Sequence, residues 1–374
     1  MPTTFLYAAV GPDLTTYAID LAAGTLTPTA SVSLPANVQY AWPHASQPVL
    51  YVASSDGVGG TMHHLSAFTI DPGTGALAPH GPTTTLPARP IHLCTDIPSR
   101  HVLVAFNNPA MLRVYEIRPD ATLGPEKSQP HPVDPGIFPH QIRITADNTL
   151  VILVARGNDP TASTPEDPGA LKIFRYIDGI LTPETTIAPN NGYGFGPRHL
   201  DFHPAGPWIY VSLERQNRLD MFERVGDAIS PTPRFSTSLL ANPATHHPHQ
   251  HGGTVHIHPN GRTVCVANRG HASLSGGGDN TLAVFAINQT TGEPTPIQHA
   301  ETHGIHCRTF HIDPSGTMLV AAHIAPATID GTTIPAGMTV FRIAHDGRLH
   351  YLRRYPIETS SKTLFWMGMV TPPV

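Results

Sequence analysis

The sequence predicts an all-β protein, a single seven-bladed β-propeller over residues 1–374 with four-stranded antiparallel blades. Three observations predict this fold. A turn followed by an apolar strand recurs seven times, and a second strand, centred on an aromatic residue, follows each copy. Proline and glycine are also abundant, with 40 and 32 residues. Short strands at a regular spacing with frequent turns between them are typical of propellers.

The first repeat is a short turn followed by an apolar strand that closes on valine. A clear copy is His258-Pro259-Asn260-Gly261, which precedes Val264-Cys265-Val266. The closing residues are Val52, Val104, Val154, Val211, Val266 and Val320. They lie 50 to 57 residues apart, and Phe5-Leu6-Tyr7-Ala8 supplies a seventh copy at the start of the chain.

The second repeat is an alternating strand with an aromatic residue at its centre, followed by a hairpin turn. Its seven copies are marked by Tyr17, Phe68, Tyr115, Phe174, Phe222, Phe285 and Phe341. Two strands are thus recognised in each copy, and about fifty residues leave room for two more, as a propeller blade requires. We expect strands from both ends of the chain to share one blade and close the ring. A β-sandwich array is the alternative, but sandwiches do not repeat so regularly.

Composition and charge exclude several functions. The formal net charge is −5 and no basic run occurs, so a nucleic-acid partner is not expected. No stretch approaches the roughly 18 apolar residues of a membrane helix, and the first ten residues do not read as a signal peptide. The three cysteines, Cys94, Cys265 and Cys307, are odd in number and far apart, which favours reduced, buried thiols in a cytoplasmic protein. A closed ring needs no partner to cover a sheet edge, so a monomer is plausible.

The candidate active site follows from position in the repeat rather than from histidine abundance, although the chain has 24 histidines. Polar residues stand where the innermost strand of each blade is expected to begin or end, and these places surround the channel mouth. His140, Arg198, His199 and Arg308 stand at the beginnings, and Glu214, Arg269 and His323 at the ends. Converging charges are costly unless they pair or meet a ligand. Guanidinium groups suit an anionic substrate, and His or Glu can move a proton. The alternative is an inter-blade salt-bridge network of Arg198, Arg269 and Glu214.

The run from His246 to His251 could supply two metal ligands from one extended side, but its spacing specifies no third. We therefore expect a solvated or substrate-facing loop, with His251 among the substrate-binding residues, and no metal. No cofactor is predicted, because the chain has no phosphate-cradling loop or dinucleotide-binding fingerprint.

One block of the sequence is similar to the lactonase family of seven-bladed propellers, which includes propeller-type 6-phosphogluconolactonases and carboxy-cis,cis-muconate cyclases. The block runs from Gly196-Pro197-Arg198-His199 through His203-Pro204 and Tyr210-Val211 to Glu214. The resemblance covers nearly the whole chain and implies that His140, Arg198, Glu214 and Arg269 line the active site. Departures from the family pattern at Ser212, Thr254 and His323 bear on the substrate.

The expected function is therefore the opening of a small anionic or sugar-derived lactone in the central channel. Arg198 and Arg269 would stabilise the oxyanion, and His140 or Glu214 would act as general base. His199, His251, Arg308 and His323 would bind the substrate. A cycloisomerase that closes a carboxymuconate to its lactone would use the same anionic pocket. A propeller that only binds other proteins is the non-enzymatic alternative.

Overall fold

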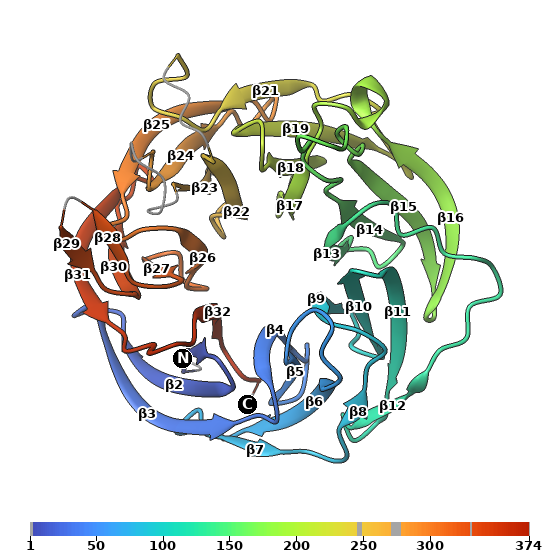
Figure 1. Ribbon diagram of the computed structural model, residues 1–374, viewed down its shortest axis with the longest axis horizontal. Helices are drawn as coiled ribbons and strands as arrows, with labels where there is room; N and C mark the ends of the chain where they lie inside the picture. Colours follow the sequence, from blue (N-terminus) through green and yellow to red (C-terminus); the bar gives the residue numbers. More distant parts are fainter. Residues whose placement is uncertain (1–2, 245–248, 271–277, 330, 374) are drawn as a thin grey trace. The chain divides into compact units, whose positions relative to one another are not determined.

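The computed structural model describes residues 3–244, 249–270, 278–329 and 331–373, which form two compact units. The first comprises Met1–Ala18, Thr27–Phe195 and Val370–Val374, and the second Ile19–Leu26 and Gly196–Met369. Among the described residues there are seven antiparallel sheets of four or five strands, a two-stranded ribbon and one short 3-10 helix, and no α-helix (Figure 1). The all-β prediction and the four-stranded blades are confirmed.

Three sheets lie in the first unit. One contains β4 (Asn37–Pro43), β5 (Val49–Ser55), β6 (His63–Ile70), β7 (Leu77–Pro79) and β8 (Thr84–Thr85). The next contains β9 (Pro90–Thr95), β10 (His101–Asn107), β11 (Ala110–Ile117) and β12 (Leu123–Glu126). The third contains β13 (Pro139–Ile144), β14 (Leu150–Ala155), β15 (Ala170–Ile177) and β16 (Ile180–Ile187), and the 3-10 helix η1 (Pro189–Gly192) follows it.

Three further sheets lie in the second unit. The first of them contains β17 (Pro197–Phe202), β18 (Trp208–Leu213), β19 (Arg218–Val225), β20 (Ala228–Ile229) and β21 (Phe235–Ser238). The next contains β22 (His251–Ile257), β23 (Thr263–Arg269), β24 (Thr281–Ile287) and β25 (Pro294–Glu301). The last contains β26 (Cys307–Ile312), β27 (Met318–His323), β30 (Gly337–Ile343) and β31 (Leu349–Pro356), while β28 (Ala327–Ile329) and β29 (Thr332–Ile334) form the ribbon.

The seventh sheet combines strands from both ends of the chain, as predicted. Its order is β3-β2-β1-β32, with β1 (Phe5–Val10), β2 (Asp13–Asp20), β3 (Thr25–Ser33) and β32 (Leu364–Val370). The assignment of residues 1–374 to a single domain stays a prediction. No helix of the described residues is long and apolar enough to cross a membrane.

The two sequence repeats correspond to the second and third strands of the sheets. The six closing valines lie on β5, β10, β14, β18, β23 and β27, and the seven aromatic marks lie on third strands such as β6 and β24. Every residue of β5, β10, β14, β18, β23 and β27 is buried. A strand covered on both faces has no polar side to present, so it consists of consecutive apolar residues instead of an alternating pattern.

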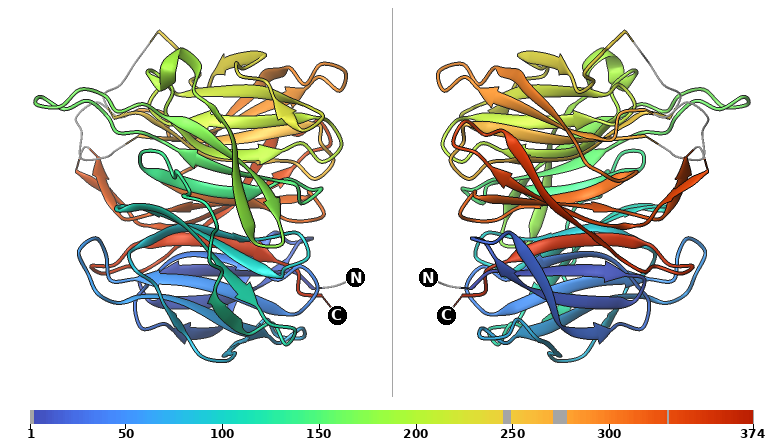
Figure 2. Two further views of the ribbon diagram at one scale, coloured as in Figure 1. Left: turned by 90° about the vertical axis from the view of Figure 1, so that its right-hand side faces the viewer. Right: turned by 90° about the vertical axis from the view of Figure 1, so that its left-hand side faces the viewer.

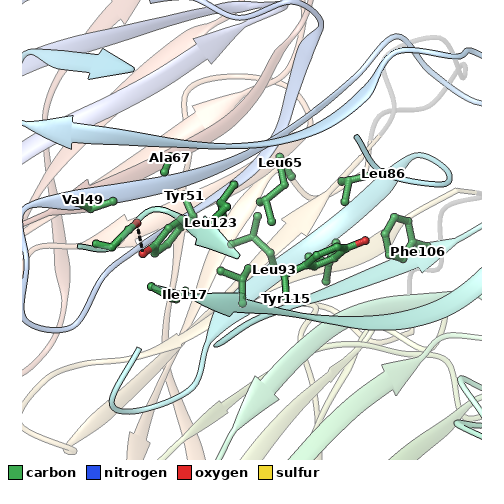
Figure 3. Packing of buried hydrophobic residues seen from close by; sticks show 14 of the residues in the cluster. Val49, Tyr51, Leu65, Ala67, Leu86, Leu93, Phe106, Tyr115, Ile117 and Leu123 are labelled. Atoms are coloured by element: carbon green, nitrogen blue, oxygen red, sulfur yellow. Dashed lines mark hydrogen bonds between the residues drawn. The ribbon is translucent and has the colours of Figure 1, made fainter. Parts of the chain in front are cut away.

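Neighbouring sheets within a unit pack face to face through their apolar side chains. In the first unit, Tyr51 and Leu65 of one sheet meet Leu93 and Tyr115 of the next in one buried cluster (Figure 3). The Tyr51 hydroxyl donates a hydrogen bond of 3.0 Å to the carbonyl of Ala121, so its polar end is satisfied inside the apolar layer. The side views show these layered sheets within each unit (Figure 2). This packing fixes the strand ends on which the polar residues stand.

In six of the seven sheets, the first strand contains one extra residue relative to its neighbour. In β13, Pro139 pairs with Ala155 and Gln141 with Val154, so His140 is the additional residue. The same shift falls on Arg198 in β17, Arg308 in β26, Gln39 in β4 and Ile91 in β9, and β22 has one between Gly252 and Val255. A β-bulge of this kind bends the strand and redirects a side chain, and bulges are frequent beside active sites.

Candidate active site

Arg198, Glu214 and Arg269 form one buried, charged cluster in the second unit. Arg198 lies at the bulge of β17, Glu214 directly follows β18, and Arg269 ends β23. The Arg198 Nε donates to Glu214 Oε1 at 3.0 Å, and the Arg269 Nη2 donates to the same oxygen. All three residues are at most 5% exposed. Two guanidinium groups therefore share one carboxylate oxygen away from bulk water, where their electrostatic interactions are strong.

This cluster is a salt-bridge network of Arg198, Arg269 and Glu214, which the sequence analysis gave as the alternative to an active site. One N–H donor of Arg269 has no acceptor in it among the described residues. Arg269 Nη2 additionally donates to the Gly252 carbonyl at 2.8 Å, whereas its Nε is buried and has no hydrogen-bond partner among the described residues. Arg198, Glu214 and Arg269 together carry one net positive charge. A buried N–H group without an acceptor is unfavourable. An oxyanion close to it would remove that cost.

The backbone holds the three charged residues in place. The Gly252 N–H donates to the Glu214 carbonyl at 2.8 Å, and the Ser212 hydroxyl donates to the Gly253 carbonyl at 2.7 Å. A Cβ atom on Gly253 would lie 3.2 Å from Arg269 Cδ and 3.1 Å from the backbone of Ala267. Glycine at this position therefore gives the Arg269 side chain room to lie along β22.

Sequence analysis assigned the polar residues to the beginning and end of one innermost strand, but they lie on two strands. His140, Arg198 and Arg308 lie at the beginnings of first strands. Arg269 and His323 end second strands, and Glu214 directly follows one. The beginning of a first strand and the end of its second strand still lie at the same edge of a sheet, because the two strands are antiparallel.

His199 and His251 adjoin the cluster. The Arg198 Nη1 lies 3.4 Å from His199 Nε2, and His251 is the residue paired with Arg269 across β22 and β23. His199 is buried and His251 is half-buried. Both histidines therefore lie beside the arginines of the cluster, and their role in substrate binding stays a prediction. His246 and His247 of the same histidine run lie outside the described residues, and no group of three potential metal ligands occurs among the described ones.

Arg308 and His323 belong to the next sheet and contact other groups. The Arg308 guanidinium lies 3.6 Å from the Phe365 ring centre, and its Nε donates to the Phe365 carbonyl at 3.1 Å. His323 is fully buried, its Nδ1 lies 3.2 Å from the Gly337 carbonyl, and its Nε2 has no partner among the described residues. The structure thus brings Arg198, Glu214 and Arg269 together and leaves Arg308 and His323 one sheet away.

His140 lies in the first unit, at the bulge of β13. It is 7% exposed, and Phe138, two residues earlier, has a φ of 53°. That left-handed conformation is unfavourable for a bulky side chain, and such strain recurs at functional sites. The Arg156 guanidinium lies 4.3 Å from the Phe138 ring centre, and the Arg156 N–H donates to the Phe138 carbonyl at 3.0 Å. These contacts hold the strained turn that presents His140.

Many other histidines have structural roles. His203 and His258 each accept turn N–H groups at Nδ1, and their Nε2 atoms lie 2.8 Å from the carbonyls of Gly261 and Gly316 in the next sheet. These rings stabilise the repeated turns and explain part of the histidine abundance.

The three cysteines are free and buried, which confirms the predicted thiols. Burial raises the pKa of each thiol to about 12, so none is a ready nucleophile.

His323 predicts a measurable pH dependence of stability. Burial, with the nearby charges of Arg354 and His303, lowers its pKa from 6.5 to about 3. The folded protein therefore holds a neutral ring, so the stability it contributes is complete above pH 6.5 and is lost as the pH falls below it. We expect about 2 kcal/mol of loss by pH 5. Urea unfolding at pH 7 and at pH 5 measures this loss as the difference between the two free energies of unfolding. His323→Gln should make that difference smaller by about 2 kcal/mol. An unchanged difference would contradict the buried neutral ring.

The fold and the site define a β-propeller with a buried charged cluster at its strand ends. This chain belongs to the family described as "Lactonase, 7-bladed beta-propeller", which matches residues 6–334. Seven blades and an enzyme of the lactonase class, both predicted from the sequence, are thereby confirmed.

Individual relatives support this assignment. The chain is 28% identical to a 6-phosphogluconolactonase of Bacillus subtilis over 300 residues, 77% of either chain. It is 26% identical to a 6-phosphogluconolactonase of Yersinia pestis over 341 residues, 90% of this chain and 89% of the relative. Among solved structures, the periplasmic gluconolactonase of Pseudomonas aeruginosa matches with a TM-score of 0.75 and 20% identity over 99% of both chains. A Lactobacillus plantarum protein matches with a TM-score of 0.75 and 22% identity over 99% of both chains. These two structures share the fold.

Proposed function

We propose that this protein hydrolyses a small lactone, one that is anionic or derived from a sugar, in the central channel of the propeller. The observation that carries the proposal is the pair of buried guanidinium groups on Glu214, with one N–H of Arg269 lacking an acceptor in the described part of the chain. Membership of the lactonase family supports the reaction class, and relatives named 6-phosphogluconolactonase support a sugar-derived substrate. A cytoplasmic location stays a prediction.

We assign the general base to His140. Glu214 is engaged with both arginines, and its role is to orient them. His140 occupies in β13 the bulge position that Arg198 occupies in β17. The assignment of both residues to one active site is the sequence prediction, which the resemblance to the lactonase family supports.

The reaction follows from these roles. A water oxygen bonds to the lactone carbonyl carbon while His140 takes its proton. The carbonyl oxygen becomes an oxyanion, which Arg198 and Arg269 stabilise in a site shielded from water. The carbonyl re-forms as the ring C–O bond breaks. The imidazolium of His140 then gives its proton to the departing alkoxide, so the products are a hydroxyl group and a carboxylic acid, which ionises.

His140→Gln tests this assignment. We expect kcat for lactone opening to fall by about 10²- to 10⁴-fold, the usual contribution of a positioned acid–base group. A pH-stat assay with 6-phosphoglucono-δ-lactone and glucono-δ-lactone measures it, after subtraction of spontaneous hydrolysis. His203→Gln, which alters a structural turn histidine, is the matched control and should retain kcat. A wild-type protein that opens no lactone would refute the function, and an active His140→Gln variant would refute the role of His140.

A further inference from the structure

An open pocket lies in the first unit, at the far end of the strands from His140. It has a volume of about 480 Å³ and forms where three neighbouring sheets meet (Figure 1). Its lining comes from the turns after β4 and β9, the end of β11, and the turn between β15 and β16. At the other end of β15, Ala170 pairs with Ala155, which in turn pairs with the residue before His140. A pocket of this volume can hold a small metabolite.

His44 lines this pocket and has an N–H group without a partner. Like His203 and His258, it directly follows the first strand of its sheet, and its Nδ1 accepts turn N–H groups, here those of Ser46 and Gln47 at 3.1 Å. Burial lowers the pKa of His44, so the ring is neutral and its proton is on Nε2. His44 is only 6% exposed, and its Nε2 forms no hydrogen bond with any residue that the structure describes.

Ser99 explains why His44 differs from the other turn histidines. The Nε2 of His203 lies on the carbonyl of Gly261, and a Cβ atom on that glycine would lie only 2.7 Å from this nitrogen. Ser99 occupies the corresponding place in the turn after β9, with a φ of 52° against 71° for Gly261, and it has a Cβ atom. Its hydroxyl instead accepts from the Ala45 N–H at 2.9 Å. The His44 ring therefore cannot make the contact that satisfies His203.

Arg100, the next residue of this turn, supplies a positive charge to the pocket. Its guanidinium group forms no hydrogen bond or ion pair within the described ranges. Its backbone is fixed, because the buried Asp96 carboxylate accepts the N–H groups of Arg100 and His101 at 2.7 and 2.9 Å. The pocket thus combines an unpaired guanidinium group on a rigid turn with the buried N–H group of His44.

The other charged side chains of the lining offset one another only in part. Lys127 and Glu116 form an ion pair at 3.6 Å. Arg118 adds a second guanidinium group, which donates to the Leu123 carbonyl. Asp178 stands in the turn between β15 and β16 with a φ of 47°, and its carboxylate has no partner in the described part of the chain. Apart from the ion pair, the lining therefore contains two guanidinium groups and one carboxylate.

We propose that this pocket binds a small hydroxylated anion, a sugar acid or a sugar phosphate, at a site separate from the proposed active site. The Nε2–H of His44 and the guanidinium of Arg100 donate to the carboxylate or phosphate oxygens, because guanidinium groups recognise both anions through paired N–H donors. The anion also supplies the acceptor that the buried His44 N–H lacks. The Asp178 carboxylate accepts from a hydroxyl group of the same ligand. This site goes beyond lactone hydrolysis and does not depend on it.

Calorimetry with gluconate, glucose 6-phosphate and uncharged glucose tests the site. We expect the wild type to bind at least one of the two anions and not glucose, and the anion that binds identifies the acidic group. Arg100→Gln should raise the Kd of that anion by about 10- to 100-fold, because a charge-assisted contact is lost. Arg198→Ala, which disrupts the proposed active site, should leave this Kd unchanged.

Two further variants make the test specific. Arg113→Gln is the matched control, since it removes the same charge from an exposed pair with Glu126, and it should not change the Kd. Asp178→Gly suits the left-handed turn position and removes the hydroxyl acceptor. It should weaken the sugar anion relative to its small analogue, which is acetate for gluconate and inorganic phosphate for glucose 6-phosphate. An unchanged ratio would refute the hydroxyl contact.

Several results would overturn the site: an unchanged Kd in Arg100→Gln, an equal loss in Arg113→Gln, equal binding of glucose, or no binding of either anion. Binding that is lost in Arg198→Ala but kept in Arg100→Gln would place the anion in the proposed active site and also overturn it. Calorimetry needs no turnover, so the result decides this proposal whether or not the protein opens lactones.

Discussion

Arg198→Ala is expected to lower kcat/KM for lactone opening by about 10³-fold, equivalent to roughly 4 kcal/mol of transition-state stabilisation. Arg198 is 1% exposed and sits beside Glu214 and His199, so no water or neighbouring side chain can replace its guanidinium without rearrangement. The loss should fall on kcat, because the oxyanion develops only as the carbonyl is attacked. A pH-stat assay at saturating and limiting lactone separates kcat from KM.

Two variants make this test specific. Arg198→Lys keeps the charge but removes the planar guanidinium group, which can donate to Glu214 and to the oxyanion at the same time. Its kcat/KM for lactone opening should still fall by about 10²-fold. Arg113→Ala removes an exposed arginine whose side chain is 44% accessible and should retain activity within about twofold. Circular dichroism and the melting temperature must show that Arg198→Ala is folded. A folded Arg198→Ala variant with near wild-type kcat would refute the proposed site.

Glu214→Gln is expected to produce the largest loss of stability, about 3–5 kcal/mol in the free energy of unfolding. The substitution keeps the side-chain shape but leaves two buried guanidinium groups without their shared carboxylate. Burying a charge without its counter-charge is far more costly than losing an exposed ion pair. Urea unfolding followed by tryptophan fluorescence measures the effect.

The exposed pair Arg113–Glu126 provides the comparison. Glu126→Gln should cost no more than about 1 kcal/mol, because both side chains are at least 40% accessible. The double variant Glu214→Gln/Arg269→Met removes one charge of each sign and should recover part of the loss. If Glu214→Gln changes the unfolding free energy as little as Glu126→Gln does, the cluster is not a buried charge network. Activity in Glu214→Gln should fall as well, since both arginines lose their orientation.

The sequence repeats did not reveal the first strand of each blade or its bulge, and several of the site residues lie there. Sequence analysis found the second and third strands of each blade, because continuous apolar runs and central aromatic residues mark them. The first strands mix glycine, polar and apolar residues, as His251–Ile257 does, and carry a bulge that breaks their alternation. The proline at the start of β13 and β17 was the available signal, since proline is tolerated at a strand's first residue and at bulges.

By itself the sequence determined the all-β class, the seven copies and the polar strand ends, because turn chemistry and hydrophobic patterning act locally and repeat along the chain. It also pointed to Arg198, Glu214 and Arg269 as candidates. Only the tertiary structure decided that both arginines bind the same carboxylate oxygen and that His323 is buried and neutral. Those outcomes depend on which strands lie side by side and on burial, and neither is encoded in the spacing of residues along one strand.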